Sequence, residues 1–183
     1  MACRFVDQKR PDLLLETVKK YKKIFLKNRI KLSLAGNGPN TFKLKNYVKN
    51  NSLIDIVNFE GYLNEDQMVK WFNKINIFIN ISNFETTPTT ILQAFAIPLP
   101  VIASNIKGHR EIAKNKFRNT SSLLLVKNNT DEIYQKIMYL YLSKKILNNY
   151  KASAEFASKK IYNDKSMFKK YFYIIKKKIN ENT

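Results

Sequence analysis

The stretch that decides the fold is residues 75–93, INIFINISNFETTPTTILQ. Its first part, Ile75 to Ile81, is almost continuously apolar and β-branched, which is typical of a parallel strand buried on both faces. A loop containing Glu85 follows. Pro88 then opens a helix, because proline is well tolerated where a helix begins. We therefore predict a buried strand, a loop, and a helix from Thr89 to Ala96.

The same alternation of strand and helix continues on both sides of this stretch. Apolar alternation and turn residues predict strands at 30–35, 54–59, 100–104 and 122–126. Helical periodicity predicts helices at 11–27, 41–51, 64–72 and 109–114, the third with a capping box formed by Asn64 and Gln67. Beyond Thr130 the pattern is helical. The fold class predicted is α/β with a parallel, doubly wound sheet.

Length and composition indicate one main domain. The chain has 183 residues and is 44% hydrophobic, which is enough for one sizeable core. We predict this domain over residues 1–163 and a basic amphipathic helix over residues 164–183, with Phe168, Phe172, Ile175 and Ile179 on one stripe. This helix is expected either to rest on an anionic membrane or to pack on a further domain.

The net charge of +19 favours a polyanionic partner, or else reflects a compositional drift toward Lys, Asn and Ile. The charge is spread along the chain and no nucleic-acid recognition motif is present, so a nucleic-acid partner is not expected.

Cys3 is the only cysteine, which excludes an intrachain disulfide and a paired-cysteine metal site. His109 is the only histidine and is predicted to lie at the surface.

The chain shows neither an apolar signal core at its start nor a stretch that could span a bilayer. Its most apolar segment, residues 94–103, is too short and contains two prolines. We expect a cytoplasmic protein, at most peripheral at the inner face of a membrane.

In an open parallel sheet, ligands bind outside the carboxyl ends of the strands, so the loops there carry the candidate site. Arg4 and Lys9 flank a turn before the first helix, a spacing that can bring both cations to one diphosphate. Two solvated surface cations are the alternative on so basic a chain. Gly36 and Gly38 follow a strand and allow close approach of the backbone to a ligand, or form a plain turn.

The loop at Glu85 gives the strongest indication of a ligand-binding site. The helix after it presents free N–H groups and the positive end of its dipole, which suit a phosphate. The Glu85 carboxylate can accept hydrogen bonds from sugar hydroxyls, and Gln93, about two helical turns along, can reach ribose hydroxyls. A capping glutamate and an exposed helical glutamine are the alternatives.

In their order and spacing, these pieces resemble the donor-binding domain of glycosyltransferase family 4, retaining GT-B enzymes that transfer a sugar from a nucleotide sugar. The resemblance runs from Arg4 to about Asn129. The matching positions are Arg4, Lys9, Gly36–Pro39, Phe59–Gly61, Ser82–Glu85, Pro88, Gln93, Pro100–Ala103 and Gly108–Ile112.

The resemblance implies a role for each candidate residue. Glu85 is the catalytic-site residue that contacts the transferred sugar. The donor-binding residues are Arg4 and Lys9 at the diphosphate, Gly36 and Gly38 in the nucleotide pocket, Thr89, Thr90 and Ile91 at the helix start, and Gln93 at the ribose. Thr90 and Ile91 are expected to offer backbone N–H groups. Cations and a helix N-terminus stabilise the departing nucleoside diphosphate, so no metal and no cofactor are expected besides the nucleotide-sugar substrate.

Several positions depart from the family pattern. Gln93 stands where the family carries a second glutamate, and Thr86, Pro98, Ser122 and Cys3 replace glycines. Thr86 is β-branched and resists positive φ, so its loop is expected to take another path.

The N-terminal end of the chain departs most from the family pattern. Met1 begins about where the family's first strand ends, so we expect that strand and an acceptor-binding domain to be missing. A sheet without that strand exposes edge groups, and the chain is expected to be poorly soluble or to need a partner chain.

The leading hypothesis is the donor half of a retaining glycosyltransferase, acting on a glycan or lipid-linked acceptor together with an acceptor-binding domain or chain. The alternative is a truncated, non-catalytic relict of such an enzyme. A basic nucleic-acid-binding protein is the third hypothesis.

Overall fold

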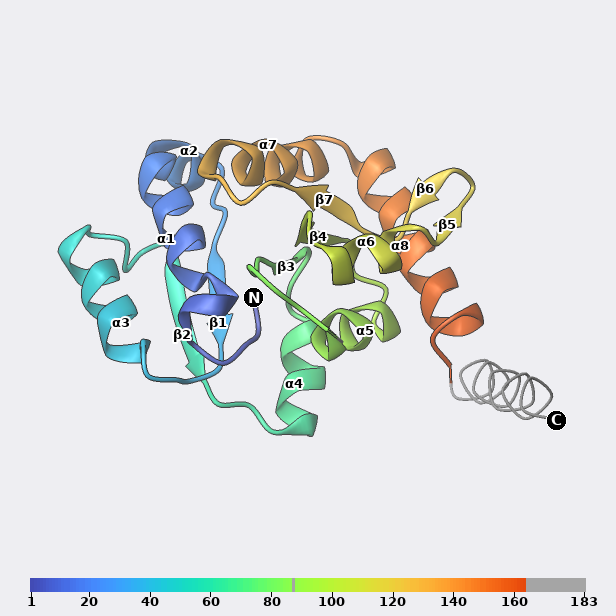
Figure 1. Cartoon of the computed structure of the whole chain (residues 1–183). Helices are drawn as coiled ribbons and strands as arrows, with labels where there is room; N and C mark the ends of the chain where they lie inside the picture. The colour runs from blue at the N-terminus through green and yellow to red at the C-terminus, as the bar shows by residue number, and fades with distance from the viewer. Residues whose placement is uncertain (87, 164–183) are drawn as a thin grey trace, which may run out of the picture.

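The computed structural model describes residues 1–86 and 88–163, which form an α/β fold with helices on both faces of parallel strands (Figure 1). The strands are β1 (Leu32–Ala35), β2 (Val57–Gly61), β3 (Phe78–Asn80), β4 (Val101–Ser104), β5 (Lys116–Phe117), β6 (Thr120–Ser121) and β7 (Leu124–Val126). The helices are the 3-10 turn η1 (Asp7–Lys9), α1 (Pro11–Lys20), α2 (Lys22–Lys27), α3 (Thr41–Asn50), α4 (Glu65–Phe72), α5 (Thr89–Ala96), α6 (Lys107–Ala113), α7 (Thr130–Tyr141) and α8 (Lys144–Lys160).

The parallel strands are arranged in two groups. In one, β1 pairs with β2; in the other, β4 lies between β3 and β7. All these pairs are parallel and each is connected through helices, which confirms the predicted fold class. The helix predicted after Pro88 has the predicted bounds, and the capping box of Asn64 and Gln67 is present at the start of α4.

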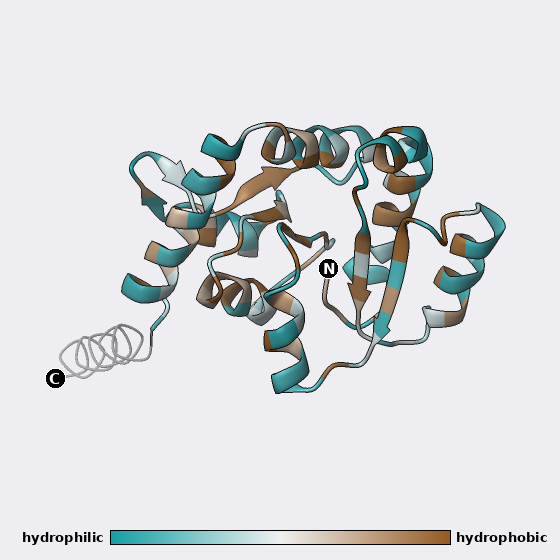
Figure 2. Cartoon of the chain, turned by 180° about the vertical axis from the view of Figure 1, so that it is seen from behind, coloured by the Kyte–Doolittle hydropathy of each residue, from teal (hydrophilic) through white to brown (hydrophobic). Residues whose placement is uncertain are grey.

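Two hydrophobic cores lie on opposite faces of the strands. One contains side chains of α1, α3 and α7, and the other contains side chains of α4, α5, α6 and α8. Figure 2 shows the hydrophobic residues gathered on the strands and on the inward sides of the helices, while the outward sides are hydrophilic. Helices covering both faces explain why β3 is buried along its whole length.

Residues 1–3 continue the β1–β2 sheet at its inner edge. Ala2 pairs with Ala35 in parallel, the Cys3 N–H donates to the Ala35 carbonyl (3.0 Å), and the Ala35 N–H donates to the Met1 carbonyl (2.9 Å). Met1 packs in one core and Ala2 in the other, which is the alternation of an extended strand. These residues are therefore extended and pair with β1 through one isolated bridge at Ala2.

Several predicted elements differ from the structure. The strand predicted over 54–59 begins only at Val57, after a turn, and ends at Gly61. The helix predicted over 11–27 is divided at Tyr21, where φ is −107°, between α1 and α2. The Tyr21 ring stacks on Tyr134 (centroids 3.7 Å apart) and its hydroxyl donates to Asp131 (2.6 Å), contacts over a hundred residues away that local periodicity does not reveal.

The hairpin of β5 and β6 was not predicted. Its turn residues Arg118 and Asn119 have φ of 48° and 64°, as a two-residue hairpin turn requires, but the usual glycine signal is absent.

The helix predicted over residues 164–183 lies outside the described residues. Among the residues that are described, none of the helices is both long and apolar enough to cross a bilayer.

Candidate functional site

The loops that follow β3, β4 and β7 are tied together by a ring of hydrogen bonds. The Ser82 N–H donates to the Ser104 hydroxyl (2.8 Å), which donates to the side-chain oxygen of Asn128 (2.6 Å). The Asn128 side-chain amide then donates to the Ser82 carbonyl (3.1 Å). Ser82 and Ser104 are buried, so this ring fixes the three loops at the carboxyl ends of their strands.

The turn η1 is attached to the loop after β3, although β1 and β3 are not paired. The Gln8 carbonyl accepts hydrogen bonds from the Asn83 N–H (2.8 Å) and from the Ser82 hydroxyl (3.0 Å). The Gln8 side-chain amide donates to the Phe84 carbonyl (2.8 Å). These bonds hold Lys9, the next residue, beside the loop that carries Glu85.

Lys9 and Glu85 form an ion pair at the centre of this arrangement. Lys9 Nζ lies 2.6 Å from Glu85 Oε1, and the side chains are 25% and 7% exposed. A carboxylate buried to this extent requires a cation or several hydrogen bonds. The pair therefore holds both groups in place, and it brings together two residues that the sequence assigned to one site.

A glycine positions the backbone of Glu85. A Cβ atom placed on Gly108 would lie 2.3 Å from the Glu85 carbonyl oxygen, closer than any real contact. Only glycine allows α6 to approach the loop this closely. The exposed Thr86 is not among the residues with positive φ, in agreement with its β-branched side chain.

Gly36 and Gly38 pack against the N-terminal turn. A Cβ atom on Gly36 (φ 124°) would lie 1.9 Å from the Cys3 carbonyl oxygen, and one on Gly38 would lie 2.5 Å from the Phe5 carbonyl oxygen. The Phe5 N–H donates to the Asn37 carbonyl (2.9 Å) within the same contact. The two glycines thus support the turn that carries Arg4; their contact with a nucleotide stays a prediction.

Arg4 lies at the surface of this turn. Its side chain is exposed, and no ion pair of Arg4 occurs within residues 1–86 and 88–163. Its guanidinium is therefore available to an anion from solvent, whereas the ammonium of Lys9 already has one carboxylate partner.

The N-terminus of α5 faces the same loops. Pro88 precedes its first turn without a side-chain cap, and the Ile91 N–H donates to the Pro88 carbonyl (2.9 Å). Thr89 and Gln93 are exposed, one helical turn apart on one face. The Thr90 hydroxyl accepts a hydrogen bond from the buried amide of Asn80 (3.2 Å). A phosphate would compete with Pro88 for the Ile91 N–H, whereas Thr89 and Gln93 are exposed to solvent.

The prediction that His109 lies at the surface is wrong. Its side chain is fully buried against the end of β4, and Nδ1 lies 2.9 Å from the Ser104 carbonyl oxygen. Burial lowers the pKa of the imidazole, which favours its neutral form. The short helix α6 turns His109 inward, and its sequence has too few turns to define a face.

The described residues contain no group of three or more His, Cys, Asp or Glu side chains that could hold a metal ion.

Sequence reasoning missed Gln8, Ser104 and Asn128, which position the site without being candidates for ligand contact. Ser104 ends β4, and Asn128 comes two residues after β7. Their place after predicted parallel strands was the available signal, because the carboxyl ends of such strands meet at one edge.

A family model described as "Glycosyl transferases group 1" matches residues 1–156. The chain belongs to this family. Over 76 residues, 42% of the chain, it is 33% identical to the alpha-monoglucosyldiacylglycerol synthase of Streptococcus pneumoniae, of which that alignment covers 17%.

Solved structures show the same fold. A TarM variant from S. aureus superposes with a TM-score of 0.78 at 24% identity, covering 94% of this chain and 34% of TarM. Alr3699/HepE of Anabaena superposes with a TM-score of 0.81 at 13% identity, covering 96% of this chain and 47% of that protein. The chain thus has the Rossmann-like fold of GT-B glycosyltransferases and spans less than half the length of these relatives.

Proposed function

We propose that this chain is the donor-binding half of a retaining glycosyltransferase that binds a nucleoside-diphosphate sugar at the loops after β3, β4 and β7. The observation that carries the proposal is the Lys9–Glu85 ion pair, which lies beside the start of α5 in a chain of this family. It supplies one cation for a diphosphate and one carboxylate for sugar hydroxyls at the edge of the sheet where ligands bind.

The charges of the site fit a diphosphate leaving group. An ammonium has three N–H donors, so Lys9 can keep one bond to Glu85 Oε1 and donate another to a phosphate. Arg4 and the N-terminus of α5 add positive charge where negative charge develops on the departing diphosphate. Because protein groups supply this charge, we propose that no metal is needed.

The relatives suggest which ligands to try first. The TarM variant and Alr3699/HepE were both solved with UDP, so UDP and its sugars are the first donors to test. The name of the S. pneumoniae relative describes the synthesis of a glycosylated diacylglycerol, which makes a lipid-linked acceptor the first acceptor to test. We propose that an acceptor-binding domain, in the same protein or a separate chain, completes the enzyme.

Isothermal titration of the chain with UDP, GDP, ADP and their sugars, with and without EDTA, tests donor binding. We expect one nucleotide series to bind, without loss in EDTA. Lys9→Met and Arg4→Ala should each weaken binding about tenfold, because each removes a charge-assisted contact. Lys145→Ala removes one charge from the exposed part of α8 and should leave the affinity unchanged.

A folded chain that binds no nucleotide or nucleotide sugar contradicts the proposal and supports the non-catalytic relict instead. If the chain binds a donor, the anomeric configuration of the product, determined by NMR after an acceptor-binding domain is supplied, tests retention. An inverted product contradicts the retaining assignment alone.

A further inference from the structure

A buried asparagine at the end of β3 is bonded to the first turn of α5. Asn80 is 4% exposed and shares one face of the sheet with Phe78, two residues earlier, and with Ala103, its register partner on β4. Phe78 and Ala103 both belong to the core that contains side chains of α4, α5, α6 and α8. The Asn80 amide therefore lies beside apolar side chains.

Only part of this amide is hydrogen-bonded. Its Nδ2 donates to the Thr90 hydroxyl oxygen (3.2 Å), while its buried Oδ1 has no hydrogen-bond partner within residues 1–86 and 88–163. A buried acceptor without a donor lowers the stability of the fold, and a leucine of similar size would avoid that loss. Packing alone therefore does not explain an asparagine here, and a role for its one bond has to be considered.

The bond from Asn80 determines how the Thr90 hydroxyl can be used. A hydroxyl has one hydrogen to donate, and the side of this oxygen that faces Asn80 already accepts the amide N–H. The hydroxyl hydrogen must therefore point away from Asn80. Thr90 is half-buried, and its hydroxyl donates to no other group among the described residues. It thus offers one unused O–H donor to a ligand.

This donor lies in the first turn of α5 (Thr89–Ala96), which begins directly after Pro88 and has no side-chain cap. The N–H groups of a first helical turn have no partner within the helix, and the helix dipole is positive there, so an anion is favoured. The Thr90 hydroxyl adds to these backbone groups a donor that depends on the identity of two side chains.

We propose that Thr90 donates its hydroxyl hydrogen to a phosphate oxygen of the nucleoside diphosphate, and that Asn80 is the positioning residue that keeps the hydroxyl in this orientation. The contact rests on the proposed function and adds a side-chain donor to it. Without the Asn80 N–H, the Thr90 hydrogen is free to turn back to a carbonyl of the preceding residues, as threonine hydroxyls in helices do. The hydroxyl would then present a lone pair, which a phosphate oxygen repels.

Isothermal titration of the full chain with UDP, GDP and ADP tests the Thr90 contact. Thr90→Val keeps the shape of the side chain without the hydroxyl and should weaken binding of the diphosphate about tenfold, because a bond to a charged group is lost. Inorganic pyrophosphate, measured by competition, should weaken by the same factor, since it carries phosphate but neither sugar nor base. Thr90→Ser retains the hydroxyl and should bind as the wild type does.

Thr17→Val is the matched control. The Thr17 hydroxyl is also buried in a helix, but it donates to the Leu13 carbonyl of its own helix α1 (2.8 Å). Its removal should leave the affinity for the diphosphate unchanged.

Asn80→Leu separates positioning from a role in the fold. The change removes both the bond to Thr90 and the unpartnered Oδ1, so Tm should rise by about 3 °C while the diphosphate binds about threefold more weakly. In the double variant Asn80→Leu/Thr90→Val, the affinity should equal that of Thr90→Val alone, because Asn80 acts only through the hydroxyl.

In a chain that binds one of the diphosphates, equal affinity of the wild type and Thr90→Val would overturn the contact alone, and so would a loss confined to the nucleotide with pyrophosphate unchanged. Lowered stability of Asn80→Leu with wild-type affinity would overturn the positioning role. A folded wild-type chain that binds none of the three diphosphates would overturn the proposed function, and this contact with it.

Discussion

The space between β1 and β3 is closed at one end and open along the rest of its length. At the carboxyl end of the strands, Gln8 and Lys9 are bonded to Ser82, Asn83, Phe84 and Glu85, so the two groups of strands are joined there. Along the rest of this space, residues 1–3 are the only ones within residues 1–86 and 88–163 that extend the ladder of β1. The candidate site thus belongs to the loops that hold the two groups together.

This difference teaches that the site geometry depends on the N-terminal turn more than on the sheet. Arg4 and Lys9 are placed by the contacts of residues 1–8 with β1 and with the loop after β3. A change that detaches this turn should separate Lys9 from Glu85 even where the core remains folded.

The largest effect is expected for Gly36→Ala. The added Cβ would overlap the Cys3 carbonyl and meet an unfavourable positive φ, so we expect a loss of about 4 kcal/mol in the free energy of unfolding. Gly61→Ala is the control, because Gly61 also has positive φ (73°) but no atom lies within 4 Å of its added Cβ. It should cost about 1 kcal/mol. Urea denaturation measures both, and equal losses would show that Cys3 can move aside.

The second effect is a pH dependence that arises from the buried amino group of Met1. The folded chain releases the Met1 proton at about pH 5 and the unfolded chain near pH 8, so between these values the unfolded state binds more protons. Stability should therefore rise with pH across this window, by at most about 1.4 kcal/mol per pH unit, and level off above it.

N-terminal acetylation provides the control, because it removes the titrating amine. His109, whose pKa burial also lowers, contributes the same sign to both forms. The difference between the two urea-unfolding profiles isolates Met1, and identical slopes would contradict burial of the amine.

The third effect concerns the Lys9–Glu85 ion pair, at the closed end of the space between β1 and β3. Lys9→Met leaves the Glu85 carboxylate, which is 7% exposed, without its cation, and we expect a loss of about 2 kcal/mol. In the double variant Lys9→Met/Glu85→Gln no uncompensated charge remains, so at least half of that loss should be recovered. A double-mutant cycle by urea denaturation measures the coupling; strictly additive losses would mean that the pair contributes nothing.

The smallest effect is expected for Asn128→Ala. It removes the acceptor of the Ser104 hydroxyl and a donor to the Ser82 carbonyl, which should cost about 1 kcal/mol. Asn73→Ala is the control, since the exposed Asn73 side chain bonds only to a carbonyl of its own helix. Thermal melting compares the two variants. If Asn73→Ala loses as much stability as Asn128→Ala, the hydrogen-bond ring through Asn128 does not stabilise the fold.

The sequence predicted the elements whose signal is local. The apolar run before Glu85, the proline at the start of α5 and the capping box of α4 each act within a few residues, and all three are present. The inward position of His109, the division at Tyr21 and the ring through Asn128 depend on residues distant in the chain. No local pattern reports such contacts.

The candidate site stays a prediction as a ligand site, and the structure adds the bonds between its residues, which the sequence did not predict. Lys9 and Glu85 were assigned to one site through the resemblance, yet their direct ion pair follows from the short bridge that Gln8 makes to Phe84. The glycines at 36 and 38 were predicted to approach a ligand, and the structure shows them approaching Cys3 and Phe5. Backbone-to-backbone packing of this kind is specific to the three-dimensional arrangement.

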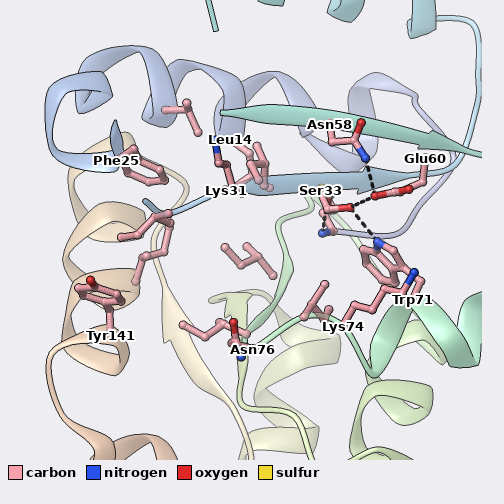
Figure 3. Close-up of a pocket in the computed structure, with 18 of the residues that line it drawn as sticks. Leu14, Phe25, Lys31, Ser33, Asn58, Glu60, Trp71, Lys74, Asn76 and Tyr141 are labelled. Atoms are coloured by element: carbon pink, nitrogen blue, oxygen red, sulfur yellow. Dashed lines mark hydrogen bonds between the residues drawn. The ribbon is translucent and has the colours of Figure 1, made fainter. Parts of the chain in front are cut away.

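The chain has one tryptophan, Trp71, and its place gives the molecule a built-in optical reporter. The indole lines the cavity between β1 and β3, and its Nε1 donates to the Ser33 hydroxyl (2.7 Å; Figure 3). Water in this cavity should shift the indole emission to the red, and an apolar molecule there should shift it to the blue. Intrinsic fluorescence alone can therefore follow, without any label, whether the gap between β1 and β3 is filled.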